Sequence, residues 1–321
     1  MPVYNAAPYI QQAVASALQF KEVCEILLIE DGSTDRSLEI CEELAGTGSR
    51  VKVIQHSDKK NHGAGASRNL GLAQASCELI AFLDADDHYL PNRFEQEHVL
   101  LELHPALDGV YGAIGVHYHD EVGKLQFERF SASQITTVSM RVDPDELFFA
   151  LLFKPGFGHF SLDALTLRKR SLEKIPHFFN EDLRLHQDTE FITRASYYLA
   201  LAPGSIEEPV TLRGVHRANR ITTNKDPSAS NIKLYTSLCN WAAQERLPTN
   251  IQHGLREKYV LWRCRSIRTF NDKVKWGREM INYRHLLKKI VIADAFFSSI
   301  FGDGSLISRI STKLAIRIFA K

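Results

Sequence analysis

Short apolar segments alternate with amphipathic ones over roughly the first hundred residues of this 321-residue chain. The apolar runs have the length and composition of strands that are buried on both faces, and they occupy residues 26–29, 51–54 and 79–83. The intervening segments carry apolar residues at helical spacing, and they occupy residues 8–18, 38–44, 64–75 and 91–104. Parallel strands need helical crossovers of this kind. The alternation therefore predicts an α/β fold with a mostly parallel central sheet.

The regular alternation fades after Gly109. The later pattern predicts strands at 109–117 and 162–167, a helix at 188–199, and strand and loop over 203–223. From about Lys233 the pattern is helical. We therefore predict an α/β domain over residues 1–226 and a helical region over residues 227–321.

The formal net charge of +1 gives no reason to expect a nucleic-acid partner. The charge is uneven, because residues 253–321 carry fifteen Lys or Arg and five Asp or Glu, a net of +10. Two rows at i+4 spacing, one apolar and one basic, consist of Leu306, Ile310, Leu314 and Ile318, and of Arg309, Lys313, Arg317 and Lys321. A basic amphipathic helix of this kind either contacts an anionic membrane surface or packs on the protein with its basic side in water.

The cysteines are odd in number, widely spaced and free of any C-x-x-C pair, and they are Cys24, Cys41, Cys77, Cys239 and Cys264. We expect neither a disulfide framework nor a zinc site, and a reducing compartment. No signal peptide opens the chain, and no run approaches the roughly 20 apolar residues of a membrane span. The expected location is cytoplasmic, either soluble or peripheral to the inner face of the cell membrane.

Acidic residues follow two of the predicted strands. Asp31 closes the first apolar run, while Asp84, Asp86 and Asp87 close the third. Ligands of open parallel sheets bind at the carboxyl ends of the strands, so both groups belong to one rim. Clustered carboxylates favour a hard divalent cation, Mg²⁺ or Mn²⁺, which in turn binds phosphates. The alternative is that Asp86 and Asp87 cap the next helix.

Four segments in a fixed order carry a family resemblance, and they are Pro2-Val3-Tyr4-Asn5, Glu30 to Asp35, Asn61-His62-Gly63 with Ser67-Arg68-Asn69, and Asp84-Ala85-Asp86-Asp87. They resemble the landmarks of family 2 glycosyltransferases, strongly over roughly the first hundred residues and weakly to about Thr223. The resemblance implies the GT-A fold, a nucleotide-binding α/β sandwich. It also implies a nucleotide-sugar donor bound with Mg²⁺ or Mn²⁺.

The resemblance assigns the donor contacts residue by residue. It implies that the base and ribose are lined by Pro2, Tyr4 and Asn5, and that Asp31 accepts the imide N–H of uracil, which favours UDP-sugars. The rest of the donor pocket would be Asn61, Gly63, Arg68 and Asn69. The competing interpretations are an Asx turn at Asp31 and a solvated arginine at position 68.

The resemblance also implies the metal ligands. Asp84 would contact the ribose or the metal shell, and Asp86 would ligate the cation that bridges the diphosphate. His216, in Arg213-Gly214-Val215-His216, resembles an Arg-x-x-His segment and could approach the metal, although a lone loop histidine is more often a surface residue. His117 and His119 superficially suggest a metal site, but no fourth ligand accompanies them.

Asp188 is the candidate general base, because the family has an acidic pair about a hundred residues after its metal motif, at the start of a helix. Here the pair is Gln187-Asp188, so the first position departs from the usual Glu. Glu181-Asp182 is a rival that matches the doublet literally. The structural alternative is that Asp188 is only an N-cap.

The reaction implied is an inverting transfer of a sugar to a glycan or lipid-linked acceptor in cell-surface polysaccharide synthesis. A sugar-1-phosphate nucleotidyltransferase or a catalytically degenerate sugar-nucleotide-binding protein is the alternative. One departure concerns the first strand, which in the family has several apolar residues before the Pro-Val-Tyr-Asn segment, whereas only Met1 precedes Pro2 here. We expect a start upstream of Met1, and an intact first strand with no gap beside it would count against that.

Overall fold

The computed structural model describes residues 1–131, 133–219, 227–267, 269–281, 283, 286, 290–301, 308 and 311–312. The chain divides into two compact units, Met1–Lys225 and Asp226–Lys321. The predicted division lies one residue further along, between residues 226 and 227. Each unit is described by itself.

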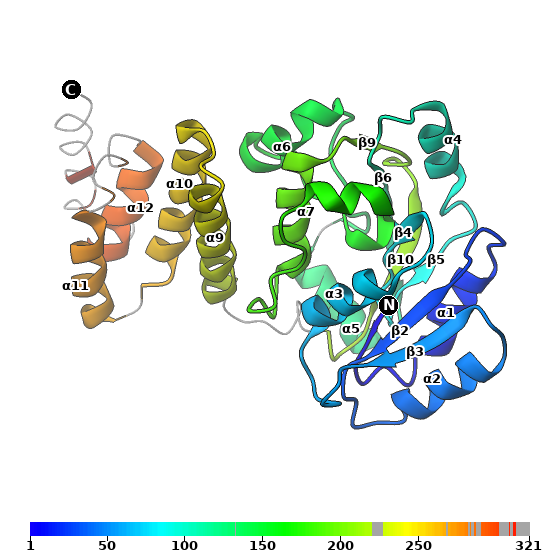
Figure 1. Cartoon of the computed structure of the whole chain (residues 1–321). Helices are drawn as coiled ribbons and strands as arrows, with labels where there is room; N and C mark the ends of the chain where they lie inside the picture. The colour runs from blue at the N-terminus through cyan, green and yellow to red at the C-terminus, as the bar shows by residue number, and fades with distance from the viewer. Residues whose placement is uncertain are drawn as a thin grey trace. The chain divides into compact units, whose positions relative to one another are not determined.

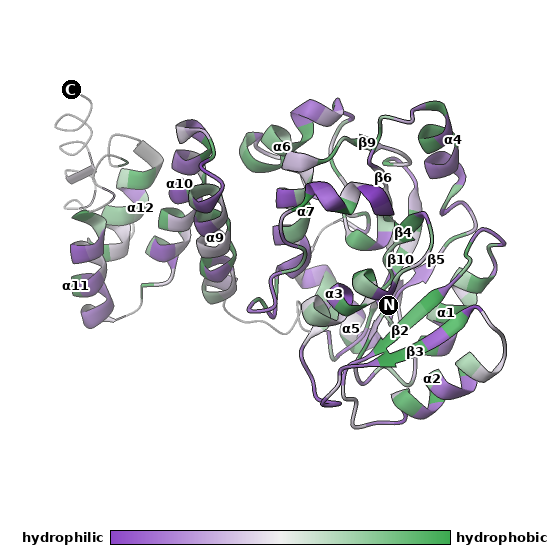
Figure 2. Ribbon diagram, in the orientation of Figure 1, coloured by the Kyte–Doolittle hydropathy of each residue, from purple (hydrophilic) through white to green (hydrophobic). Residues whose placement is uncertain are grey.

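The first unit begins with a parallel sheet in the order β1-β2-β3, made of β1 (Pro2–Val3), β2 (Ile26–Glu30) and β3 (Val51–Gln55). The helices that link and follow these strands are α1 (Ile10–Leu18), α2 (Ser37–Gly46) and α3 (Ala64–Gln74). Helix α1 buries Ile10, Ala13, Val14 and Ala17, which is the spacing of one helix face. Strands β2 and β3 lie side by side and are apolar over most of their length (Figures 1 and 2).

Two further sheets complete this unit. The order β4-β8-β6-β9 joins β4 (Leu79–Ala81), β8 (Leu165–Arg168), β6 (Gly109–Tyr111) and β9 (Leu201–Pro203). The order β5-β10-β7 joins β5 (His88–Tyr89), β10 (Pro209–Val215) and β7 (Ala113–Tyr118). Strand β8 is antiparallel to both of its neighbours, and β5 is antiparallel to β10. The other pairs in the described residues are parallel, so the predicted mostly parallel α/β architecture is confirmed.

The remaining helices of the first unit are α4 (Glu95–Leu103), α5 (Glu121–Phe130), α6 (Pro144–Phe153) and α7 (Gln187–Tyr198). Helix α6 starts with Pro144, whose fixed φ suits the first helical turn. The strand predicted at 162–167 begins instead as a 3₁₀ turn, η1 (Leu162–Ala164), and only then becomes β8. A second 3₁₀ segment, η2 (Lys169–Lys174), follows it.

Two apolar clusters stabilise the first unit. One includes Val3, Val14 and Leu28 under the β1-β2-β3 sheet, and the other includes Leu165 and Phe191 around the β4-β8-β6-β9 sheet. Two acid-bearing chain segments, the residues after β2 and after β4, lie at strand ends, where the sequence predicts the site.

The second unit contains α9 (Pro227–Gln244), α10 (Thr249–Arg265), α11 (Phe270–Glu279) and α12 (Ile290–Phe301). A cluster that includes Val260, Trp276 and Phe296 is buried between its helices. The predicted basic amphipathic helix, from Leu306 to Lys321, lies outside the described residues apart from isolated positions. Among the residues described, none of the helices has both the length and the apolar character needed to cross a bilayer.

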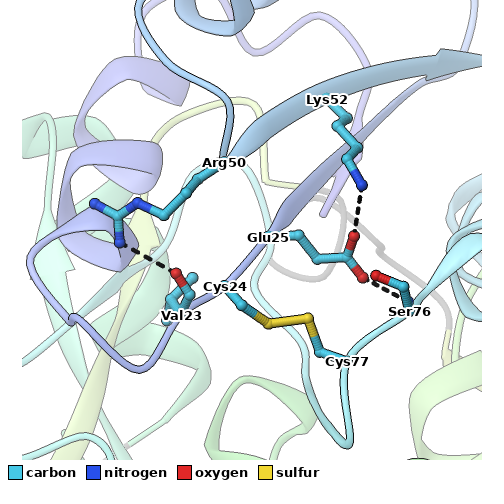
Figure 3. Close-up of a disulfide and its surroundings, with 7 residues drawn as sticks. All are labelled: Val23, Cys24, Glu25, Arg50, Lys52, Ser76 and Cys77. Atoms are coloured by element: carbon cyan, nitrogen blue, oxygen red, sulfur yellow. Dashed lines mark hydrogen bonds and ion pairs between the residues drawn. A yellow bond between two sulfur atoms is a disulfide. The ribbon is translucent and has the colours of Figure 1, made fainter.

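The sequence indicates no disulfide framework, but two of the five cysteines are paired. Cys24 and Cys77 form a disulfide across 53 residues of sequence, with their Cα atoms 6.9 Å apart (Figure 3). Cys41, Cys239 and Cys264 are free thiols. The spacing of the cysteines in the sequence does not predict this pair. The two residues lie just before different strands, β2 and β4, and come together only in the tertiary fold.

Candidate active site

Asp31 follows β2 and holds the loop that leads into α3. It is only 2% exposed, and its carboxylate accepts hydrogen bonds from the Asn61 side-chain amide at 2.9 Å, the His62 N–H at 2.7 Å and the Gly63 N–H at 2.8 Å. His56 Nε2 also lies 3.5 Å from Oδ1 of the same carboxylate. Asp31, Asn61 and Gly63, which the sequence groups as donor residues, are thus in direct contact.

The loop is tightly packed at Gly63, the N-cap of α3. Its φ is 93°, and the Arg184 guanidinium lies against it. Glycine is the residue that adopts this conformation without strain and allows this approach. The same Arg184 nitrogen donates to the Asn61 side-chain oxygen at 3.2 Å. Arg184 is a positively charged residue that the sequence analysis did not single out, and its side chain lies over the Asp31 loop.

The predicted base-lining residues lie at the end of β1, beside the Asp31 loop. Pro2 pairs with Ile29 in the ladder, and the Tyr4 side chain is 44% exposed. Asn5 has a φ of 51°, donates its N–H to Ser33 Oγ at 3.1 Å and accepts from the Thr34 N–H at 2.8 Å. These bonds join the first two sequence landmarks at one edge of the sheet.

Asp84 forms an ion pair with Arg68 at the end of β4. The Arg68 Nη2 donates to Asp84 Oδ1 at 2.5 Å, and the Asp84 N–H donates to Asp163 Oδ1 at 2.9 Å. Burial lowers the pKa of Arg68, but the charges of Asp84, Asp163 and Asp188 outweigh burial and raise it. Arg68 is buried, so the solvated-arginine interpretation is wrong. Its side chain brings three carboxylates from distant parts of the chain to one place.

Asp86 contacts His216. Its Oδ2 lies 3.2 Å from His216 Nε2 and 3.3 Å from Asn219 Nδ2. The His216 ring is stacked on Tyr9, with ring centres 4.7 Å apart, and Tyr9 also packs against His119. Strand β5 follows this segment and α4 begins only at Glu95, so the helix-cap interpretation of Asp86 and Asp87 is wrong. The half-exposed Asp86 carboxylate has a fixed histidine beside it.

Asp87 and Asp163 are buried next to one another. Burial raises the pKa of Asp163 to about 6, with the Asp84 charge adding to the effect. Burial and the Asp163 charge raise the pKa of Asp87 well above its usual range. Asp87 Oδ1 accepts the Gly214 N–H at 2.8 Å, while Asp163 Oδ1 accepts the Asp84 N–H. These hydrogen bonds connect the segment after β4 to β10 through Asp87 and to η1 through Asp163.

The described residues contain one group of three acids whose oxygens could share a cation, Asp84, Asp87 and Asp163, with those atoms within 4.8 Å of one another. This set differs from the predicted one, which joined Asp84 to Asp86 and His216. The structure instead places Asp86 and His216 together and Asp84 with Arg68.

Asp188 is the second residue of α7, and the N-cap is His186, with a φ of 63°. The N-cap interpretation of Asp188 is therefore wrong. The charge of Asp188 is one of those that raise the pKa of Arg68, so Asp188 lies near that side chain. Of its rivals, Glu181 accepts from the Asn69 amide at 2.8 Å, and Asp182 is exposed in a turn.

Asn69 has a different environment from the other predicted donor residues. Its amide donates to the Phe179 carbonyl and accepts the Phe179 N–H, both at 2.9 Å. These bonds fix the segment that leads into α7. Near the start of α3, an added Cβ on Gly65 would lie 2.5 Å from Oε1 of Gln187 in the first turn of α7, so the N-terminal ends of the two helices are close together.

Sequence reasoning missed several residues at this site, namely Tyr9, His119, Asp163, Arg184 and Asn219. No local pattern marks them, because each reaches the site through long-range topology. The antiparallel β8, for example, brings Asp163 to the Asp84 backbone. His119 had been considered only as a metal ligand, and in the described residues it belongs to no group that could hold an ion.

The model of the family described as "Glycosyl transferase family 2" matches residues 1–173, more than half of the chain. The chain belongs to this family. An uncharacterized glycosyltransferase of Haemophilus influenzae is 41% identical over 98 residues, which cover 30% of this chain and 38% of that protein. The succinoglycan biosynthesis protein ExoU of Rhizobium meliloti is 40% identical over 92 residues, which cover 29% of this chain and 26% of ExoU. These matches span less than two thirds of either relative.

Solved structures share the fold of this family 2 chain. Staphylococcus aureus TarS 1–349 in complex with UDP-GlcNAc matches with a TM-score of 0.61 at 16% identity, over 99% of this chain and 88% of that one. The mannosyltransferase PcManGT from Pyrobaculum calidifontis, in complex with GDP-Man and Mn²⁺, matches with a TM-score of 0.50 at 14% identity, over 100% and 79%. The predicted GT-A fold is confirmed.

Proposed function

We propose that this protein transfers a sugar from a nucleotide donor, most simply a UDP-sugar, to a glycan or lipid-linked acceptor, with inversion at the anomeric carbon. One observation carries the proposal: acids from three separate sequence segments lie at strand ends or at a helix start, namely Asp31, the pair Asp84 and Asp86, and Asp188. Two of them, Asp84 and Asp188, interact with the same buried arginine, Arg68. The UDP-GlcNAc complex of TarS supports a uridine donor, and the assignment of ExoU to succinoglycan biosynthesis supports a polysaccharide acceptor.

The nucleoside is assigned to the edge formed by β1 and β2. We assign the imide N–H of uracil to Asp31, because a carboxylate is an acceptor and this one is held in place by three loop hydrogen bonds. Tyr4 offers an exposed aromatic face next to it, and Asn5 is held by Ser33 and Thr34. Pro2 completes this wall from β1.

The diphosphate is assigned to the space near the α3 and α7 N-termini. Helix N-termini carry partial positive charge and free N–H groups, and they favour phosphate. Arg68 and Arg184 add full positive charges next to these ends. Asn61 and Gly63 form the loop between them, whereas we propose that Asn69 positions the α7 segment rather than contacting the donor.

We assign the divalent cation, Mg²⁺ or Mn²⁺, to Asp86 and His216. The fit rests on chemistry that the structure shows: a half-exposed carboxylate lies 3.2 Å from a histidine nitrogen, with the ring fixed by Tyr9. Asp84 is already paired with Arg68 and is assigned to the ribose or the outer shell of the metal. Asp87 and Asp163 are buried, accept backbone N–H groups and have raised pKa values, so we assign them a structural role. When bound, the cation would offset negative charge on the diphosphate.

The chemical step needs one base. Asp188 removes the proton of the acceptor hydroxyl while its oxygen attacks the anomeric carbon, and the bond from that carbon to the diphosphate oxygen breaks on the opposite face. The product is a glycoside of inverted configuration, and the nucleoside diphosphate leaves. Arg68 connects Asp188 electrostatically to the Asp84 segment that holds the ribose.

A panel of nucleotide sugars with Mn²⁺ tests the proposal, with released nucleotide and sugar-labelled acceptor measured together. We expect a UDP-sugar to release UDP, and the release to increase with acceptor. Release of pyrophosphate from a nucleoside triphosphate and a sugar phosphate would show a nucleotidyltransferase instead. Binding without turnover of any donor would show a degenerate site.

A further inference from the structure

Three histidines lie in a row on one face of the β5-β10-β7 sheet. His88 belongs to β5, His117 belongs to β7, and His119 directly follows β7. The ring centres of His88 and His117 are 5.1 Å apart, and those of His117 and His119 are 4.7 Å apart. All three residues are partly exposed. We call these three residues the histidine face, and the sugar transfer proposed for this chain assigns no role to them.

The register of the sheet explains why these rings meet. His88 pairs with Leu212 across the β5-β10 ladder, and His117 pairs with Gly214 across the β10-β7 ladder. Side chains that are opposite one another, or two residues apart on one strand, point to the same face of a sheet. His88 and His117 therefore lie on the same side of β10, and their rings come together over it.

The histidine face is continuous with the proposed cation site. Nε2 of His119 lies 3.4 Å from the Asp86 carbonyl oxygen, and an added Cβ on Gly214 would collide with that same oxygen. The ring centre of Tyr9 is 4.6 Å from that of His119 and 4.7 Å from that of His216. A molecule bound on the histidine face would therefore adjoin a donor whose diphosphate is held at Asp86.

The chemistry of these rings suits hydroxyl groups. A neutral imidazole has one N–H donor and one acceptor nitrogen, and a sugar hydroxyl likewise donates and accepts. Burial and a neighbouring positive charge both favour the neutral form of an imidazole, and each ring of this face has another ring beside it. Nδ1 of His88 is buried and has no hydrogen-bond partner in the described part of the chain. The protein thus leaves part of the polar capacity of this face unused.

A metal ion fits the histidine face less well. Among the residues described, the group whose ligand atoms all lie within 4.8 Å of one another consists of Asp84, Asp87 and Asp163, and no histidine belongs to it. An anion fits less well for another reason. It offers only acceptors, so it would require protonated rings next to one another.

We propose that the histidine face binds the sugar acceptor, through the hydroxyl groups of an uncharged sugar ring. This inference rests on the proposed sugar transfer and narrows its acceptor to a glycan whose terminal sugar carries no charge. The nucleoside is assigned to the β1-β2-β3 sheet, whereas the histidine face belongs to the β5-β10-β7 sheet. Donor and acceptor would therefore reach Asp86 from different sheets, and His88 and His117 would select the acceptor without contacting the nucleotide.

Binding of methyl glycosides tests the inference without any sugar transfer. The probes are the methyl glycosides of glucose, galactose, mannose and N-acetylglucosamine, each added to the full chain with UDP and Mg²⁺. Methyl glucuronoside is the charged counterpart of methyl glucoside. Nuclear magnetic resonance of protein with isotope-labelled histidine rings follows each ring, with signals assigned from single variants. We expect at least one neutral glycoside to shift the signals of His88 and His117, while the signal of His98, an exposed residue of α4, stays in place.

Two substitutions at His117 separate a neutral hydrogen-bonding role from a charged one. His117→Ala removes both ring nitrogens, so we expect the affinity for the glycoside to fall roughly 5- to 10-fold. His117→Gln keeps a donor and an acceptor but cannot carry a charge, so it should bind the same glycoside within about threefold of the unchanged protein. His98→Ala is the matched control and should bind it normally. The affinity for UDP should stay within about twofold in all three variants, because the nucleotide is assigned to another sheet.

Three results would overturn the inference. The first is turnover of a UDP-sugar by a protein in which no glycoside shifts the histidine face, a result that leaves the proposed function standing. The second is tighter binding of methyl glucuronoside than of methyl glucoside together with its loss in His117→Gln, which would show an anion site. The third is a loss of affinity for UDP-GlcNAc, but not for UDP, in His117→Ala, which would place the donor sugar here. Glycoside binding at the face without turnover of any nucleotide sugar would instead support the sugar site and contradict the proposed function.

Discussion

At the scale of single residues, the site separates acids that look equivalent in sequence. Asp86 and Asp87 are neighbours, yet Asp86 is half-exposed beside His216 while Asp87 is buried against Gly214 and Asp163. Likewise Asp188 lies near Arg68, while Asp182 lies in an exposed turn. The burial and the neighbours of each aspartate, rather than its residue type, therefore distinguish the roles proposed for these acids.

Replacing Asp188→Asn keeps the shape of the side chain but removes the basic oxygen. We expect the rate of sugar transfer to fall roughly 10²- to 10⁴-fold, with nucleotide binding almost unchanged. Asp182→Asn is the matched control and should transfer normally. Near-normal transfer by Asp188→Asn, in a protein whose thermal unfolding is also normal, would remove Asp188 from the mechanism.

Replacing Asp86→Asn should weaken Mn²⁺ and nucleotide binding together, by roughly tenfold or more, because it removes the charged ligand of the cation that holds the diphosphate. Asp87→Asn, one position along, should leave both affinities within about threefold, since Asn can still accept the Gly214 N–H. Calorimetric titration of UDP with and without Mn²⁺ measures this contrast. The reverse pattern would place the cation on the Asp84, Asp87 and Asp163 group.

At the scale of elements, the sequence predicts what depends on local periodicity. Strands β2 and β3 and helices α1, α3 and α7 follow from apolar spacing, and the acids after β2 and β4 follow from the rule about strand ends. The pairing of Cys24 with Cys77 and the contact of Asp163 with Asp84 do not follow, because each joins residues more than fifty positions apart through strand order. Strand order is a property of the whole fold, which one local segment does not encode.

At the scale of the whole molecule, every residue assigned to the donor, the cation and the base belongs to the first unit, while the basic excess belongs to the second. This division favours catalysis by the first unit and attachment to an anionic membrane surface by the second. The helical unit has its own core around Trp276, which is consistent with a separate role.

Peripheral membrane contact is the prediction at this scale. We expect the chain to co-sediment with vesicles that contain anionic lipid, less so at high salt, and to lose this binding when the residues after Gly304 are removed. Neutral vesicles are the control. Binding that is unchanged by the truncation would eliminate a membrane role for the predicted basic helix.

In the proposed mechanism, a donor diphosphate and a divalent cation meet at Asp86. Crystals grown with UDP and Mn²⁺, measured at the manganese absorption edge, test it most directly. We expect one anomalous peak within ligand distance of the Asp86 carboxylate and the His216 Nε2, next to the diphosphate, with the uracil at Asp31. A peak among Asp84, Asp87 and Asp163, or UDP bound in full occupancy without any manganese peak, would contradict it.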